Sequence, residues 1–162
     1  MNKKIIALLL VVALAVSGAF AFGIGAMNSN VAGTGALTFA LDGHQGLYLG
    51  VGYDSWNGGG IAFSGEYKFW EWNFLNNVGG FFNWGLQAGA GANVSLGFGN
   101  GFAIGAGVYG FFGTNIYLDF SKNFGVEFFG QWQPNFFITL FPFGWNWSRL
   151  WGGYASGVRF WF

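Results

Sequence analysis

Side chains along most of this chain alternate between large apolar residues and small or polar ones, which is the period of a β-strand. In residues 60–70 the apolar positions are Ile61, Phe63, Tyr67 and Phe69. The positions between them are Ala62, Ser64, Glu66 and Lys68. Successive side chains of a strand point to opposite faces, so this segment has one apolar face and one small or polar face. A chain built from such segments is predicted to be all-β.

The same alternation recurs in further segments along the chain. They cover residues 22–27, 34–41, 47–54, 83–90, 102–109, 124–133 and 153–162. Two of the connections, residues 55–59 (SWNGG) and 97–101 (GFGNG), have the glycine and asparagine composition of hairpin turns. The pattern therefore predicts eight antiparallel strands.

Composition indicates which surroundings each face meets. Charged residues make up 7% of the chain and aromatic residues 23%, whereas a typical soluble domain is about 25% charged. The second face is mostly Gly, Ala, Asn and Gln, which makes a poor water-facing surface but fits the interior of a narrow barrel. An apolar face in lipid requires that every backbone group pairs between strands and that the sheet closes. We therefore predict one domain, an eight-stranded antiparallel up-and-down transmembrane β-barrel.

The first residues have the pattern of a secretory signal peptide. Lys3 and Lys4 form a basic region, residues 5–16 are apolar, and Ala19 and Ala21 complete a cleavage site of small residues. The alternative is an uncleaved anchor, but the apolar run is shorter than the ~20 residues that a spanning helix needs. We predict a signal peptide over residues 1–21 and the barrel over residues 22–162.

The few charged residues of the predicted strands fall on the small or polar face. By strand parity Glu66, Lys68, Glu127 and Arg159 all point inward. Lys or Arg on the lipid face at mid-membrane costs about 2 to 4 kcal/mol, which also favours an inward position. The last two predicted strands are neighbours, so an ion pair of Arg159 with Glu127 is geometrically plausible. This interior polar network is interpreted as a plug that locks the barrel, with a gate or ion path as the alternative.

Other functional classes lack their residues in this sequence. His44 is the single histidine, and no motif places a serine nucleophile beside it, so catalysis is not predicted. The chain has no cysteine, and its histidine and scattered carboxylates lack the spacing of metal ligands. There is no basic stripe that would bind nucleic acid. We therefore predict no enzyme activity and no cofactor.

An aromatic segment over residues 134–151 (PNFFITLFPFGWNWSRLW) is unusual for a connection bathed in water. One interpretation extends the last two strands, so that Trp145, Trp147 and Trp151 join an aromatic girdle at the membrane interface. The alternative is a lip that collects hydrophobic ligands, formed by these tryptophans with Phe141. The first interpretation is favoured.

The C-terminal segment ends on Phe162, with Tyr154, Val158 and Phe160 on the same face. Together with the signal peptide and the alternating strands, this resembles bacterial outer-membrane β-barrels, whose last strand is recognised by the barrel assembly machinery. By size the chain is similar to the small barrels of the OmpX, OmpA transmembrane-domain and OmpW type, and its FGIGA opening and FWF ending are similar to short spirochaete outer-membrane barrels. The resemblance implies the outer membrane of a diderm bacterium as the location and outer-membrane lipid as a partner.

The sequence thus leads to a structural outer-membrane barrel with a polar, side-chain-filled interior and no catalysis. The alternative is an OmpW-like passage or binding protein for small hydrophobic molecules. A host-surface adhesin is disfavoured, because the connections are short and apolar and depart from the long, polar protruding strands of the OmpX type.

Overall fold

The computed structural model describes residues 22–41, 46–122, 124–146 and 152–162, except the side chains of residues 145 and 146. The predicted signal peptide, His44, Trp147 and Trp151 lie outside these ranges. The elements, in chain order, are β1 (Phe22–Ser29), β2 (Gly33–Leu41), β3 (Leu47–Asp54), the short 3-10 turn η1 (Trp56–Gly58), β4 (Gly60–Val78), β5 (Phe82–Gly97), β6 (Ala103–Ser121), β7 (Phe124–Trp132), β8 (Asn135–Phe141), β9 (Gly144–Asn146) and β10 (Tyr154–Trp161). In the described ranges no helix has the length and apolar character needed to cross a membrane.

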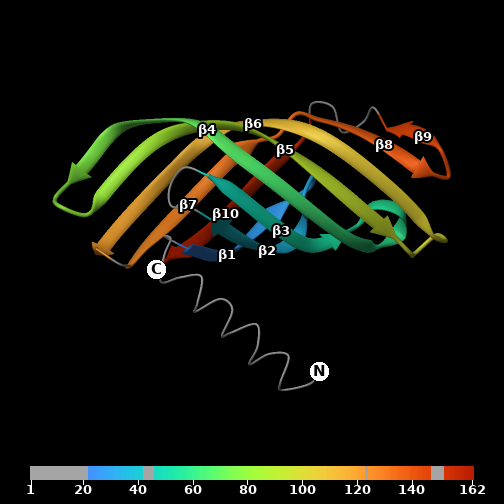
Figure 1. The fold of residues 1–162 in the computed structure, drawn as a ribbon, viewed down its shortest axis with the longest axis horizontal. Coiled ribbons are helices and arrows are strands. Elements are labelled where there is room, and N and C mark those ends of the chain that lie inside the picture. Colours follow the sequence, from blue (N-terminus) through green and yellow to red (C-terminus); the bar gives the residue numbers. More distant parts are fainter. Residues whose placement is uncertain (1–21, 42–45, 123, 147–151) are drawn as a thin grey trace, which may run out of the picture.

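The strands close into an antiparallel barrel (Figure 1). Each strand from β1 to β6 pairs with the next along the chain, β6 pairs with β7, β7 with β10, and β10 with β1. The predicted all-β fold with an eight-stranded antiparallel barrel is therefore confirmed.

β7 and β8 form one continuous barrel strand, because both pair with β6 in a single register. Phe112 lies opposite Trp132 of β7. Tyr109, three residues before Phe112, lies opposite Asn135, three residues after Trp132. The interruption falls at Pro134, which has no N–H to donate to a neighbour. β9 then turns back along β8. Residues 135–141 and 144–146 are therefore strand, so the predicted extension of the seventh strand is present.

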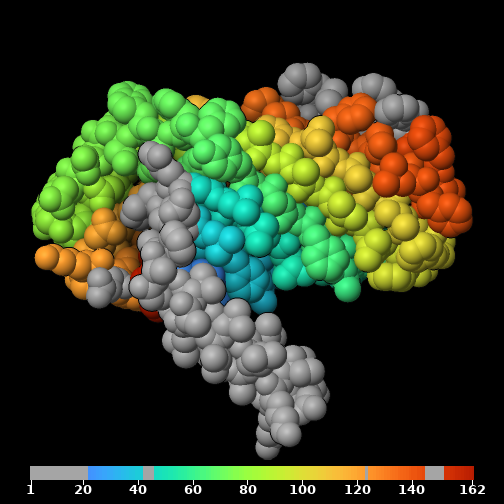
Figure 2. Space-filling model, in the orientation of Figure 1, coloured from blue at the N-terminus to red at the C-terminus, as the bar shows by residue number. Residues whose placement is uncertain are grey.

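The wall of the barrel is uneven in height. β1, β3 and β10 have 8 residues and β2 has 9, whereas β4 and β6 have 19 and β5 has 16. The long strands project past the short ones at both ends, with the β4–β5 hairpin at one end and β8 and β9 at the other (Figures 1 and 2). The predicted bounds were too short for β4, β5 and β6. In β4 the alternation changes phase at a bulge after Lys68.

The end of the barrel beside β8 is closed by two turns. The turn between β1 and β2 folds inward, so that Val31 is 1% and Ala32 0% exposed. Ser29 Oγ accepts hydrogen bonds from the N–H groups of both residues at 3.0 and 2.9 Å, and Asn93 Nδ2 donates to Val31 O at 2.7 Å. Trp56 of η1 packs edge-on against an aromatic ring of β8 with 5.3 Å between ring centroids.

Candidate functional site

The interior of the barrel holds the polar residues, and its outer surface holds the large apolar ones. Lys68 and Arg159 are each 1% exposed and Glu127 is 0% exposed. The exposed large side chains of the barrel wall include Leu37, Leu49, Phe63, Tyr67, Val108, Phe128 and Phe160. This is the reverse of a water-soluble domain. The alternation in the sequence predicted which face each of these residues occupies.

Arg159 and Glu127 form an ion pair inside the barrel. They are cross-strand partners on β10 and β7, and Arg159 Nη1 lies 3.2 Å from Glu127 Oε2. Arg159 Nε also donates to Thr38 Oγ1 at 3.2 Å. The guanidinium carbon lies 4.2 Å from the ring centroid of Tyr48 and 3.9 Å from that of Phe129. A planar cation between aromatic faces and a carboxylate is held by both cation–π attraction and charge.

Glu66 lies in a separate hydrogen-bonded cluster of the interior. Its Oε1 accepts from Tyr109 Oη at 3.0 Å and from Gln133 Nε2 at 2.8 Å. Ser29 Oγ donates to Gln133 Oε1 at 2.9 Å, which links the cluster to the inward-folded turn. Among the described residues, Glu66 has these hydrogen bonds but no ion pair. Of the other predicted interior charges, Glu127 pairs with Arg159, and Arg159 and Lys68 both lie over the ring of Tyr48, at 4.2 and 5.8 Å from its centroid.

Lys68 pairs with a carboxylate that the sequence interpretation did not include. Lys68 Nζ lies 2.6 Å from Glu71 Oε2 and 3.0 Å from Tyr117 Oη. Residues three apart lie on opposite faces of a regular strand, so this contact depends on the bulge, which leaves both Phe69 and Trp70 exposed. The adjacent aromatic pair Phe69 and Trp70 was the signal in the sequence that the alternation changes phase here.

Inward aromatic rings fill space that inward glycines leave. The cross-strand partners are Tyr109 with Gly91, Phe111 with Gly89 and Phe129 with Gly157. A Cβ atom placed on Gly91 would lie 2.7 Å from Tyr109 Cζ, closer than real contacts allow. An aromatic ring packed over a cross-strand glycine is a known way to stabilise a curved sheet. The interior is thus occupied by side chains at several levels.

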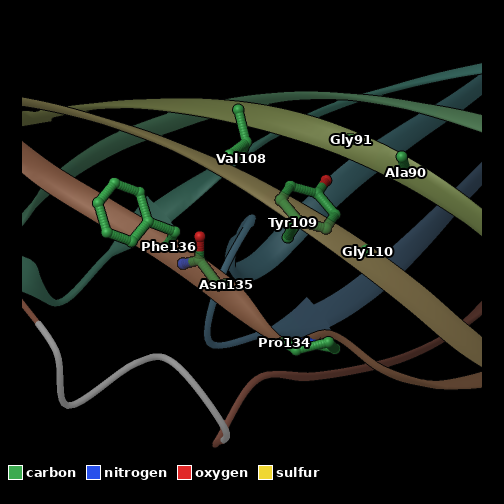
Figure 3. Close-up of a pocket in the computed structure, with 8 residues that line it drawn as sticks. All are labelled: Ala90, Gly91, Val108, Tyr109, Gly110, Pro134, Asn135 and Phe136. Carbon is green, nitrogen blue, oxygen red and sulfur yellow. The ribbon is translucent and has the colours of Figure 1, made fainter.

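The outer wall carries a shallow groove where β5, β6 and β8 meet (Figure 3). Its volume is about 420 Å³, and it is lined by Ala90, Val108, Gly110, Pro134 and Phe136 among others. A neighbouring groove of about 380 Å³ shares Val108 and Phe136. Both grooves arise because small outward residues replace the large aromatic ones that cover the rest of the wall.

The predicted hydrophobic lip is described only in part. Phe141, at the end of β8, is 58% exposed, and its ring centroid lies 6.4 Å from that of Phe102. Phe98 joins this cluster through Phe102 at 5.9 Å. The side chain of Trp145, and Trp147 and Trp151 entirely, lie outside the described part.

The C-terminal strand presents the predicted assembly residues on its outer face. Tyr154, Phe160 and Phe162 are exposed, and Val158 is partly exposed. Phe162 N donates to Phe22 O at 2.9 Å, and Phe22 N donates to Phe162 O at 3.3 Å. These backbone hydrogen bonds continue the pairing of β10 with β1.

Across the described ranges, no three histidine, aspartate or glutamate side chains come together as metal ligands would. Comparisons with protein-family models, curated proteins and solved structures find no match for this chain.

Proposed function

We propose that this protein is a structural β-barrel of the outer membrane, with its apolar wall in lipid and an interior that blocks the passage of solutes. The observation that carries the proposal is the inverted distribution of side chains. Charged residues such as Arg159 and Glu127 are fully buried inside a closed barrel, while aromatic and aliphatic side chains cover its outside.

Lipid is the environment in which an apolar outer wall and a charged interior are stable. Burial of apolar surface contributes about 25 cal/mol per Å², so a wall of exposed Phe, Trp, Leu and Val would be strongly disfavoured in water. A closed barrel satisfies the backbone groups of its wall between strands, as the hydrocarbon region requires. Phe162 and the outward residues of β10 support the barrel assembly machinery as a partner during insertion.

The filled interior favours a barrel that blocks solutes, as opposed to an open channel. Arg159 with its partners and the Glu66 cluster are buried inside the barrel, and Val31 and Ala32 fold into one end. An eight-stranded barrel is just wide enough for side chains to fill. The proposed role is therefore a scaffold in the cell envelope, without catalysis.

Two measurements on the mature chain refolded in detergent test this proposal. We expect a difference in gel mobility between unheated and boiled samples in SDS, because a closed barrel has few free edges from which to unzip. We also expect liposomes that contain the protein to retain small sugars and ions as well as empty liposomes do. Helical or disordered circular dichroism would contradict the barrel in lipid, and rapid solute leakage would contradict the blocked interior.

A second candidate function is the binding of small hydrophobic molecules, favoured by the groove in Figure 3. Its volume falls in the range of about 300 to 1,000 Å³ that ligand pockets occupy. A brominated alkane should then quench tryptophan fluorescence saturably, and Ala90→Leu, which fills the groove, should abolish the saturable part. The double variant Trp145→Ser with Trp147→Ser tests the predicted lip in the same assay. Quenching that rises linearly with probe would indicate partition into lipid or detergent instead.

A further inference from the structure

The two sides of the barrel present walls of different height to the membrane. β1 and β10 have 8 residues each, whereas β6 has 19. At a rise of about 3.4 Å per residue and a tilt of about 40°, these strands span about 20 Å and about 50 Å along the barrel axis. The hydrocarbon core of a bilayer is about 30 Å thick. The side formed by β1 and β10 is therefore too short to cross it, whereas the side formed by β6 is long enough.

The apolar part of the short side is shorter still. The outward residues of β1 are Phe22, Ile24, Ala26 and Asn28, and those beside them on β10 are Phe162, Phe160, Val158 and Ser156. Because the row of Asn28 and Ser156 is polar, only the three rows from Phe22 to Ala26 are apolar. These rows cover about 10 Å along the axis, whereas the apolar band of outer-membrane barrels is about 25 Å tall.

The wall ends after β1 because the chain turns into the barrel there. Val31 and Ala32 are buried inside, and Tyr154 N donates to Asn30 Oδ1 at 2.8 Å, which joins this turn to the start of β10. Tyr154 is exposed on the outer side, and tyrosine side chains prefer the level of the lipid headgroups. On this side of the barrel the headgroups are therefore expected next to the row of Ser156.

The polar residues of the short side differ from their counterpart on the tall side. Ser156 lies opposite Gly130 of β7, and Gly130 lies opposite Thr114 of β6, so Thr114 continues the same outward row. Thr114 Oγ1 donates to a backbone carbonyl of β5 at 2.9 Å and accepts from Trp84 Nε1 at 2.8 Å. The side chains of Asn28 and Ser156 form no hydrogen bond to another residue of the described ranges. Their polar groups are thus available to lipid.

We infer that the bilayer thins beside β1 and β10, and that phospholipids cross there between the two leaflets. A wall shorter than the hydrocarbon core is accommodated by local thinning, and a tilt of the whole barrel would only reduce the height of this side further. The barrier to crossing is the loss of hydration of the charged headgroup, which falls as the path through hydrocarbon shortens. Asn28 and Ser156 offer amide and hydroxyl groups to the headgroup along this path. The exchange runs in both directions and needs no energy source.

Back-extraction of a fluorescent phospholipid tests the inference. The mature chain is reconstituted into liposomes that contain a phospholipid with one short, labelled acyl chain, and albumin then removes the label that reaches the outer leaflet. Albumin is far too large to enter an eight-stranded barrel, so a leak through the interior does not imitate lipid exchange. We expect the protein to make the label of the inner leaflet extractable, whereas liposomes without protein retain it.

A pair of double variants tests where the lipids cross. Asn28→Leu with Ser156→Leu extends the apolar band by one row, about 5 Å along the axis. Because the cost of mismatch changes with each Å of the band, we expect the extraction rate to fall at least about fivefold. The control, Ala92→Leu with Ala106→Leu, adds the same side chains to outward positions of β5 and β6 and should keep the unmodified rate. Longer acyl chains in the liposomes should slow exchange by the unmodified protein, since a thicker core is harder to thin.

Lipid exchange rests on the proposed membrane setting, so the heat-dependent gel shift and the retention of an entrapped sugar are recorded on every sample. A preserved shift without extraction of the inner-leaflet label rejects lipid exchange alone, and so do equal rates for the two double variants. If Asn28→Leu with Ser156→Leu loses the shift, the acyl-chain series decides, because a rate independent of chain length rejects the thinning. A lost shift in the unmodified protein rejects the barrel in lipid, and leakage of the sugar rejects the blocked interior.

Discussion

Arg159 on β10 lies directly opposite Glu127 on β7, and Arg159 Nη1 is 3.2 Å from Glu127 Oε2 inside the barrel. Both side chains are fully buried. The pair joins two strands that are neighbours in the barrel but are separated in sequence by β8 and β9. Removal of the pair therefore tests what stabilises the contact between β7 and β10.

The first prediction concerns this pair. Glu127→Ala leaves a buried guanidinium without its carboxylate, so we expect the free energy of unfolding to fall by about 3 to 5 kcal/mol. The double variant Glu127→Leu with Arg159→Met removes both charges and should lose clearly less. Urea unfolding in lipid, followed by tryptophan fluorescence, measures both variants. Equal losses for the single and double variants would show that the loss does not come from the unpaired guanidinium.

A second prediction concerns the packing of inward rings over glycines. A Cβ atom on Gly105 would collide with the ring of Phe137 on β8, so Gly105→Ala should lower the free energy of unfolding by about 1 to 3 kcal/mol. Adding Phe137→Leu shortens the opposing side chain and should recover part of the loss. Gly130→Ala is the matched control, because no atom lies within 4 Å of its Cβ position, and its effect should stay within about 0.5 kcal/mol. A loss for the control as large as that for Gly105 would point to backbone effects instead.

Much of the fold could be predicted from the alternation alone. A period of two assigns each residue to a face. In an up-and-down barrel each strand pairs with the next one along the chain, and the last strand pairs with the first. That is why the position of Arg159 opposite Glu127 could be anticipated, although β10 and β7 are not consecutive strands. The small inward residues and the large outward ones followed from the same period.

The features that were missed are those that interrupt this period. The bulge after Lys68 adds one residue to β4, so the alternation seemed to end near Trp70 when the strand continues to Val78. For the same reason Glu71 was assigned to no interior site. The inward fold of Val31 and Ala32 has no periodic signal. Ser29 Oγ accepts local hydrogen bonds from the N–H groups of both residues, but Asn93, which donates to Val31 O, lies 62 residues away in the sequence. The contact with Asn93 is not encoded locally.

The third prediction addresses Glu71. Glu71→Ala removes the only ion-pair partner of the buried Lys68 among the described residues, and we expect a loss of about 3 kcal/mol in the free energy of unfolding. The loss should lie at the low end for a buried pair, because Lys68 keeps its contact with Tyr117. Asn73→Ala is the control, since Asn73 is an exposed polar residue of the same strand and should change stability by less than about 0.5 kcal/mol. The same urea unfolding assay applies, and equal effects at both positions would contradict the role given to the bulge.

The last prediction separates assembly from stability at the C-terminal residue. Phe162 is exposed on the outside, and its backbone, not its side chain, makes the hydrogen bonds to Phe22 that continue the pairing of the last strand with the first. Its ring contacts Phe124 with 5.8 Å between centroids. Phe162→Ala should therefore lower the free energy of unfolding of the refolded protein by about 1 kcal/mol or less, since an exposed side chain loses little packing.

In cells, the amount of heat-shifting barrel in the outer-membrane fraction should nevertheless fall several-fold for Phe162→Ala, because this aromatic residue is the proposed signal for the assembly machinery. Phe128→Ala removes an outward aromatic residue from β7 and should leave that amount unchanged. Equal amounts for both variants would contradict the assembly role, and a large loss of stability in refolded Phe162→Ala would show that the residue acts through packing.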